Sequence, residues 1–72
     1  MKIEERIKKD IKLFEENRKE VDDTQILEMA ERYYQDAKFY LEKKDFFTAF
    51  GCINYAHGLI DAVRMKENRK ME

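Results

Sequence analysis

Residues 46–65 read FFTAFGCINYAHGLIDAVRM, and this stretch decides the fold. It is the least charged segment of a chain in which 43% of the residues are charged, and it holds both glycines, the only cysteine and the only histidine. At the 100° steps of an α-helix its apolar residues fall on two separate sides. One side carries Ala49, Cys52, Ile53, Ala56, Leu59, Ile60 and Val63, and the second carries Phe47, Gly51, Tyr55, Gly58, Ala62 and Met65. A helix that is apolar over most of its circumference needs more than one covering partner.

Two amphipathic segments precede this one, and no proline interrupts them. In residues 2–18 a narrow apolar stripe consists of Ile3, Ile7, Ile11 and Phe14. This helix is supported by opposite charges four residues apart, namely Glu4 with Lys8, Glu5 with Lys9, and Glu15 with Lys19. Residues 24–43 carry a broader stripe of Ile26, Leu27, Ala30, Tyr33, Tyr34, Ala37, Tyr40 and Leu41. We expect this second helix to cover one apolar side of the third helix, and the first helix to cover part of the other.

Short breaks separate the three segments. Asp22 followed by Gln25 predicts a capping box at the start of the second helix, with Asp23 as a competing cap. Asp45 is well placed to cap the third helix. Connections this short join antiparallel neighbours. We therefore expect one all-α domain over residues 1–72, a three-helix antiparallel bundle with helices at about 2–18, 24–43 and 46–68.

The composition excludes several classes of partner. Lys and Arg nearly balance Asp and Glu, and the net charge of −1 gives no electrostatic reason to expect nucleic acid or an anionic membrane. No apolar run follows Met1, and nothing approaches the roughly 20 apolar residues of a membrane span. One cysteine forms no disulfide within the chain. These features favour a cytoplasmic protein.

A polar seam between the two apolar sides holds Asn54, His57, Asp61 and Arg64. His57 and Asp61 have the i,i+4 spacing that lets two side chains hold one metal ion, but a structural zinc site needs four ligands. The seam, with Tyr33 or Tyr34 of the second helix, is therefore a candidate for a small ligand or a metal. The alternative that we favour is a polar network that joins helices and satisfies a tyrosine hydroxyl. The residues predict no cofactor and favour a non-enzymatic protein.

Gly51 and Gly58 lie two helical turns apart on the same side, together with Phe47, Tyr55 and Met65. Glycine inside a helix costs about 1 kcal/mol relative to alanine. This placement favours a groove, extended by Ala62, where another backbone comes close. The alternative is a pair of tolerated surface glycines. Phe39, on the charged side of the second helix, is a further candidate for contact with another chain.

The second and third helices also resemble a known family. The residues that carry the likeness are Tyr33-Tyr34, Asp36-Ala37 and Tyr40-Leu41, followed by NYAHG at 54–58 and Asp61-Ala62. They resemble the archaeal family catalogued as domain of unknown function 357. The resemblance implies a compact helical bundle with no assigned activity and no catalytic residues to carry over. It also implies a possible accessory role beside nucleotidyltransferase-like enzymes. The turn EKKD at 42–45 departs from the EKGD expected for the family.

Taken together, the sequence favours a small helical module for protein interaction, self-associating as a homodimer. The reason is the excess of apolar surface on residues 46–65, together with Phe39. A ligand or metal site at Asn54, His57 and Asp61 is the alternative.

Overall fold

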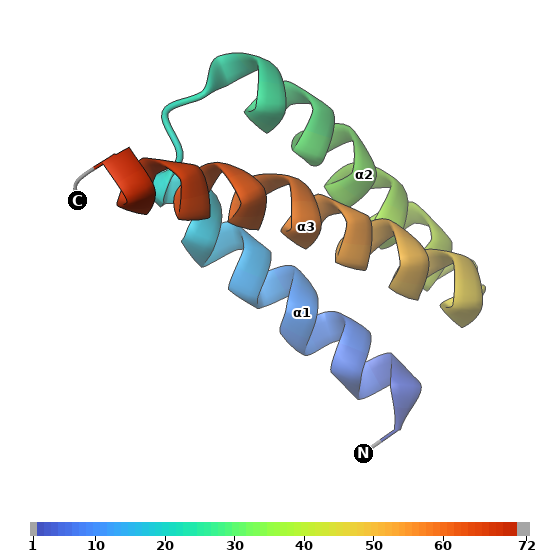
Figure 1. Cartoon of the computed structure of the whole chain (residues 1–72). Helices are drawn as coiled ribbons and strands as arrows, with labels where there is room; N and C mark the ends of the chain where they lie inside the picture. The colour runs from blue at the N-terminus through green and yellow to red at the C-terminus, as the bar shows by residue number, and fades with distance from the viewer. Residues whose placement is uncertain (1, 71–72) are drawn as a thin grey trace.

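The computed structural model describes residues 2–70 of the chain and, among them, the side chains of residues 2–65. The helices are α1 (Ile3–Asn17), α2 (Thr24–Glu42) and α3 (Phe46–Lys70), with a short 3-10 turn, η1 (Arg18–Glu20), after α1 (Figure 1). No strand occurs in residues 2–70. The predicted three-helix antiparallel bundle is confirmed. Every helix bound lies within two residues of the predicted one, and after the first helix the chain tightens into η1.

The helix α3 lies between the other two, with α2 along one side of it and α1 along the other (Figure 1). It packs more extensively against α2 than against α1, and α1 and α2 touch least. The Cα positions extend over 42 × 25 × 16 Å. Phe47, Tyr55 and Met65 of α3 are all exposed, so no described element of the chain covers that side of α3.

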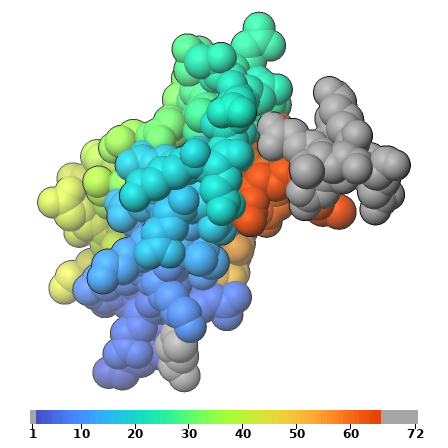
Figure 2. Space-filling view, turned by 90° about the vertical axis from the view of Figure 1, so that its left-hand side faces the viewer, coloured from blue at the N-terminus to red at the C-terminus, as the bar shows by residue number. Residues whose placement is uncertain are grey.

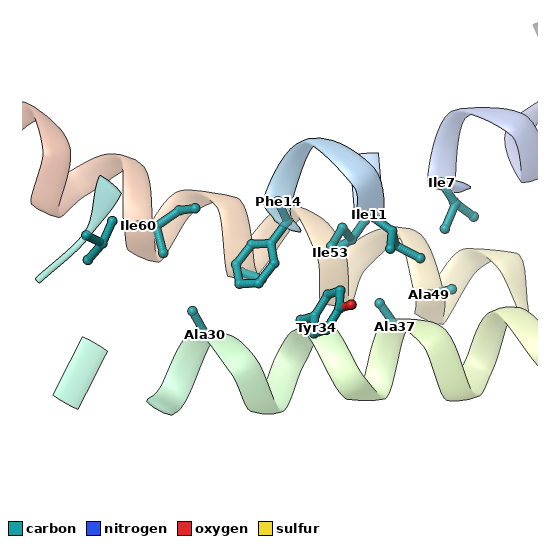
Figure 3. Packing of buried hydrophobic residues seen from close by; sticks show 11 residues of the cluster. Ile7, Ile11, Phe14, Ala30, Tyr34, Ala37, Ala49, Ile53 and Ile60 are labelled. Carbon is teal, nitrogen blue, oxygen red and sulfur yellow. The ribbon is translucent and has the colours of Figure 1, made fainter. Parts of the chain in front are cut away.

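The core forms where the three helices meet (Figure 3). Four residues of α3 are fully buried, and they belong to the alanine and isoleucine side that the sequence predicted: Ala49, Ile53, Ala56 and Ile60. Ala30 and Ala37 of α2 are also fully buried, and their small side chains let α2 lie close to α3. From α1, Ile7, Ile11 and Phe14 enter this core, while Ile3 is 44% exposed. The narrow stripe of α1 is thus confirmed for Ile7, Ile11 and Phe14, whereas Ile3 lies outside the core.

The N-terminus of α2 is capped by Asp23 and not by Asp22. The Asp23 carboxylate accepts a hydrogen bond from the Ile26 amide at 3.1 Å, so the capping box predicted from Asp22 and Gln25 is wrong. Val21 is buried and anchors the connection to the core. This anchoring explains the choice of cap, because a buried Val21 brings the chain to the helix start with Asp23 in the extended conformation of an N-cap.

The break between α2 and α3 is a tight Schellman turn. The Lys44 amide donates to the Leu41 carbonyl at 3.0 Å, and the Asp45 amide donates to the Tyr40 carbonyl at 2.9 Å. Lys44 has a φ of 64°, in the left-handed region that glycine adopts most easily. Asp45 then caps α3 as predicted, accepting from the Thr48 amide at 3.3 Å. In the described part of the chain no helix has both the length and the apolar content to cross a bilayer.

Candidate functional site

His57 joins α3 to α1. Its Nε2 lies 2.7 Å from the backbone carbonyl of Asp10, and since a carbonyl only accepts, this nitrogen donates. The imidazole also meets the Phe14 ring at a near right angle of 87°, with centroids 5.8 Å apart. This half-buried ring therefore uses one nitrogen and one edge to hold two helices together. Its neighbours are a backbone oxygen and an apolar ring, neither of which prepares it for acid–base chemistry.

Asp61 and Arg64 reach a different partner. Arg64 Nη2 lies 3.0 Å from Glu20 Oε2, and its Nη1 donates to Asp61 Oδ1 at 3.5 Å. Arg64 thus ties α3 to η1, and Figure 2 shows the cyan turn after α1 beside the orange part of α3. All three side chains are at least one third exposed, so the pair is screened and contributes less than about 1 kcal/mol. The seam residues therefore split into separate contacts.

Tyr34 lies at the centre of the contact between α1 and α2. Its ring stacks on Phe14 with centroids 5.0 Å apart, and the two rings meet between the helices in Figure 3. Its hydroxyl donates to the Glu15 carboxylate of α1, so a side chain of α1, and not one of the predicted seam on α3, satisfies this tyrosine. The Arg18 guanidinium lies 5.1 Å from the ring centroid and pairs with Glu31. Glu15 and Arg18 thereby clamp α1 onto α2.

The chemistry around Tyr34 keeps its phenol neutral. Burial, and then the Glu15 carboxylate, raise the pKa of Tyr34 above its ordinary value, because both disfavour a phenolate. Only 3% of the residue is exposed. A buried neutral phenol with its hydrogen bond already made is a structural group, so Tyr34 is not available to a ligand.

Cys52 is half-buried on the side of α3 that meets α2. Burial, and then the carboxylates of Asp36 and Asp45, raise the pKa of the Cys52 thiol. A protonated thiol is a poor nucleophile and a poor metal ligand. The side chain therefore acts as a small apolar residue at the edge of the core.

Tyr33 points to the other side of the bundle from Tyr34. Its ring packs against Tyr55 of α3, with centroids 4.4 Å apart and planes tilted by 38°. Beside this pair, Asn54 is exposed and lines a shallow hollow with Gly51, Tyr55, Gly58 and Leu59. Asn54 and Tyr33 are thus on the solvent side of α3 and α2, whereas His57 and Tyr34 are on the α1 side. The predicted ligand seam is not brought together as one site.

No group of three His, Cys, Asp or Glu side chains that could share a metal ion occurs within the part of the chain that the structure describes. The alternative of a metal or ligand held jointly by Asn54, His57 and Asp61 therefore gains no geometric support. Asn54 lines the shallow hollow, His57 contacts the Asp10 carbonyl, and Asp61 contacts Arg64.

The outer face of α3 is the feature that the structure leaves open. We define it as the glycine side of the helix, whose members are all exposed: Phe47, Gly51, Tyr55, Gly58, Ala62 and Met65. Phe47 is 91% exposed, Met65 63% and Tyr55 53%. The expectation that the first helix covers part of this side is wrong, because α1 packs along His57 and the Phe50 ring, which Arg6 approaches at 5.9 Å. The sequence pattern predicted two apolar sides on α3. The helix α1 packs against the boundary between these two sides.

The two glycines show how empty the space over this face is. A Cβ atom placed on Gly51 or Gly58 would meet nothing within 4 Å. No backbone in residues 2–70 approaches either glycine, so the predicted close approach is not made within this range. The space remains open to another molecule.

Phe39 lies apart from this face, on the solvent side of α2, and is 52% exposed. Its ring meets Tyr40 edge-on at 5.2 Å, and the Lys43 ammonium lies 5.4 Å from its centroid. These neighbours from its own helix cover part of the ring. Phe39 and the outer face of α3 are therefore separate surfaces.

The sequence prediction missed two carboxylates, Asp10 and Glu15. Asp10 follows Ile7 by three residues and precedes Phe14 by four, so it occupies a position in the buried stripe of α1. Its side chain is 13% exposed, and its Oδ2 lies 3.3 Å from Arg6 Nε. A carboxylate at an apolar position of the helical pattern was the signal. Glu15 gave no such signal, since its spacing equally suited Lys19.

Comparisons with known proteins complete the description. No curated protein and no solved structure matches the chain. One family model does match, over residues 2–68, and its description is protein of unknown function (DUF357). The match includes α1, which the sequence motifs had left outside the resemblance. Since it covers nearly the whole chain, this three-helix protein belongs to the DUF357 family.

Proposed function

We propose that this chain is a small non-enzymatic interaction module that binds a second copy of itself through the outer face of α3. The observation that carries the proposal is the exposure of Phe47, Tyr55 and Met65 on one face. Only Asp61 and Arg64 are charged between residues 46 and 65, and Arg64 is engaged with Glu20. An exposed apolar patch on a highly charged protein is typical of an interaction surface.

The size of the face sets the expected affinity. Phe47 to Met65 spans about 27 Å of helix at a rise of about 1.5 Å per residue. Large aromatic side chains bury about 150–250 Å² each, so Phe47, Tyr55 and Met65 at about 200 Å² each give at most roughly 1,200 Å² for two faces, the lower end of specific interfaces. Tyr33 continues the apolar surface from Tyr55 onto α2. We expect a weak dimer with a Kd of about 10 μM to 1 mM.

A second copy suits this face for two further reasons. The net charge of −1 produces almost no long-range repulsion between copies. A chain of 72 residues buries a small share of its surface alone, and association is one of the few ways to enlarge its core. A cytoplasmic setting in an archaeon, as the family resemblance implies, fits an unpaired Cys52.

Sedimentation equilibrium across the range from about 10 μM to 1 mM tests the proposal, because this range brackets the expected Kd. The wild-type chain is expected to pass from monomer to dimer. Phe47→Glu places a charge where the most exposed ring of the patch would be buried in the dimer, and it is expected to weaken association at least about tenfold. Circular dichroism should show unchanged helix content, since Phe47 contacts little in the monomer.

Leu13→Glu is the matched control. Leu13 is an apolar residue with 46% exposure, but it lies on α1 and away from the outer face of α3. This variant should associate like the wild type. A wild-type chain that stays monomeric at the highest concentration, or an equal effect of both variants, would overturn the proposal.

A further inference from the structure

We infer that the two copies pair through α3 in an antiparallel manner, about a two-fold axis that passes between Asn54 and Tyr55. In this arrangement Phe47 of each copy lies over Ala62 of the other, and Gly51 faces Gly58. The inference rests on the proposed self-association and adds the orientation and register of the partner. It is drawn from the order of large and small residues along the outer face of α3.

The first argument is the match between bulk and space. Phe47 stands near the start of the outer face, and Ala62 stands near its end, about 22 Å further along the helix. Gly51 and Gly58 lie between them. The pair Phe47 and Ala62 and the pair Gly51 and Gly58 share one midpoint, between Asn54 and Tyr55. Reversing the helix about this midpoint therefore places Phe47 over Ala62 and each glycine over the other, and it puts the two Tyr55 rings next to each other at the axis.

The second argument is the open space above both glycines. Nothing in the described part of the chain lies within 4 Å of a Cβ placed at either one. Interaxial distances depend on the side chains at the contact and reach about 8 Å when those are small. A second α3 can therefore come close at Gly51 and Gly58, and Phe47 can then reach across at both ends. The open space above the glycines thus admits the second helix, and the exposed Phe47 ring gains a contact on it.

The third argument is charge and polarity. A parallel pairing in register would place Phe47 on Phe47 and Asp61 beside Asp61, bulk against bulk and like charge against like charge. The antiparallel pairing separates the two Asp61 carboxylates by about 20 Å along the helix, beyond a Debye length at physiological salt. It also brings the two Asn54 side chains together near the axis. An amide both donates and accepts, so two such groups related by a two-fold axis satisfy each other.

Cysteine cross-linking tests the register. The native thiol is first removed as Cys52→Ala, and Asn54→Cys or Ala62→Cys is then added in separate proteins. A disulfide needs Cα atoms within about 7 Å. Asn54→Cys, next to the axis, is expected to oxidise to a covalent dimer at least about tenfold faster than Ala62→Cys, whose two copies would lie about 22 Å apart along the helix. A mixture of Gly51→Cys and Gly58→Cys proteins should give a mixed dimer faster than either protein alone.

Sedimentation of each variant before oxidation separates the possible failures. If the variants dimerise but Ala62→Cys cross-links as fast as Asn54→Cys, the pairing is parallel and the inference is wrong, while the proposed function stands. If they dimerise and neither position cross-links, another surface forms the dimer, and the inference again fails. If the wild-type chain is monomeric throughout, the proposed function fails and the inference falls with it.

Discussion

The inner and outer sides of α3 share one backbone but have different surroundings. On the inner side, Ile53 and Ile60 are fully buried between α1 and α2. On the outer side, Phe47 is almost fully exposed and the glycines face open space. The apolar residues of the inner side are therefore part of the folding free energy, and those of the outer face are not. This difference teaches that the apolar content of a helix does not reveal its use until the covering elements are known.

The test with the largest expected effect on stability removes one aromatic ring from the core and one from the outer face of α3. Phe14→Ala empties the fully buried centre of the core and is expected to cost about 3–5 kcal/mol in the free energy of unfolding, enough to unfold much of a marginal domain. Phe47→Ala, measured at a concentration where the chain is monomeric, should change it by less than about 0.5 kcal/mol. Urea unfolding followed by circular dichroism measures both. Similar losses in the two variants would break the comparison.

A smaller effect is expected for the two neighbouring tyrosines. Tyr34→Phe removes the hydrogen bond to Glu15 and should cost about 1 kcal/mol at neutral pH. Tyr33→Phe is the matched control on the outer side, where the ring packs on Tyr55, and it should cost less than about 0.5 kcal/mol. Both rings remain in place in these variants. Equal costs from chemical denaturation would show that the clamp at Glu15 contributes nothing.

The difference in stability between the wild type and Tyr34→Phe is also expected to depend on pH. Because burial and Glu15 raise the pKa of Tyr34 in the folded state, its contribution is fully present below the unfolded pKa of about 10. It is lost as the pH rises from there through the folded pKa. The difference in stability between the wild type and Tyr34→Phe should therefore shrink above about pH 10. A difference that stays constant up to about pH 11 would contradict this cause.

The sequence predicted the parts of this fold that depend on local order. Helix bounds, the Asp45 cap and the buried alanine and isoleucine side of α3 all follow from spacing along the chain. The crossing of α1 over α3 does not, because it is set by how Phe14 and Ile7 fit between two other helices. For this reason the contact of His57 with the Asp10 carbonyl could not be read from the i,i+4 spacing of His57 and Asp61.

For the outer face of α3, too, local spacing predicted one part and long-range packing decided the rest. The pattern identified every residue of the outer face of α3, since these residues share one side of a helix. It could not tell that α1 would leave this face uncovered. The Glu15 side chain shows the same limit, because the predicted pairing with Lys19 is replaced by a partner nineteen residues away, Tyr34. Long-range partners depend on which helices meet, and spacing within one helix carries no such information.

The last prediction concerns Lys44, which lies in the turn before α3. It tests whether fold stability can change without a change in association. Lys44 holds a φ of 64° in the turn that leads into α3, a conformation that costs a residue with a Cβ about 1–2 kcal/mol. Glycine adopts it freely but loses more entropy on folding, so Lys44→Gly should stabilise the chain by about 0.5–1 kcal/mol. Lys43→Gly is the matched control, because Lys43 has a φ of −77° and gains nothing from glycine.

Thermal unfolding measures the gain, and sedimentation of the same protein measures association. If the outer face of α3 is independent of the fold's stability, Lys44→Gly should raise the midpoint of unfolding and leave the dimer Kd unchanged. An equal shift from Lys43→Gly would show that the gain does not come from the backbone conformation at Lys44. A tighter dimer in Lys44→Gly would mean that the position of α3 still varies in the monomer. The inner contacts would then decide how well the outer face is presented.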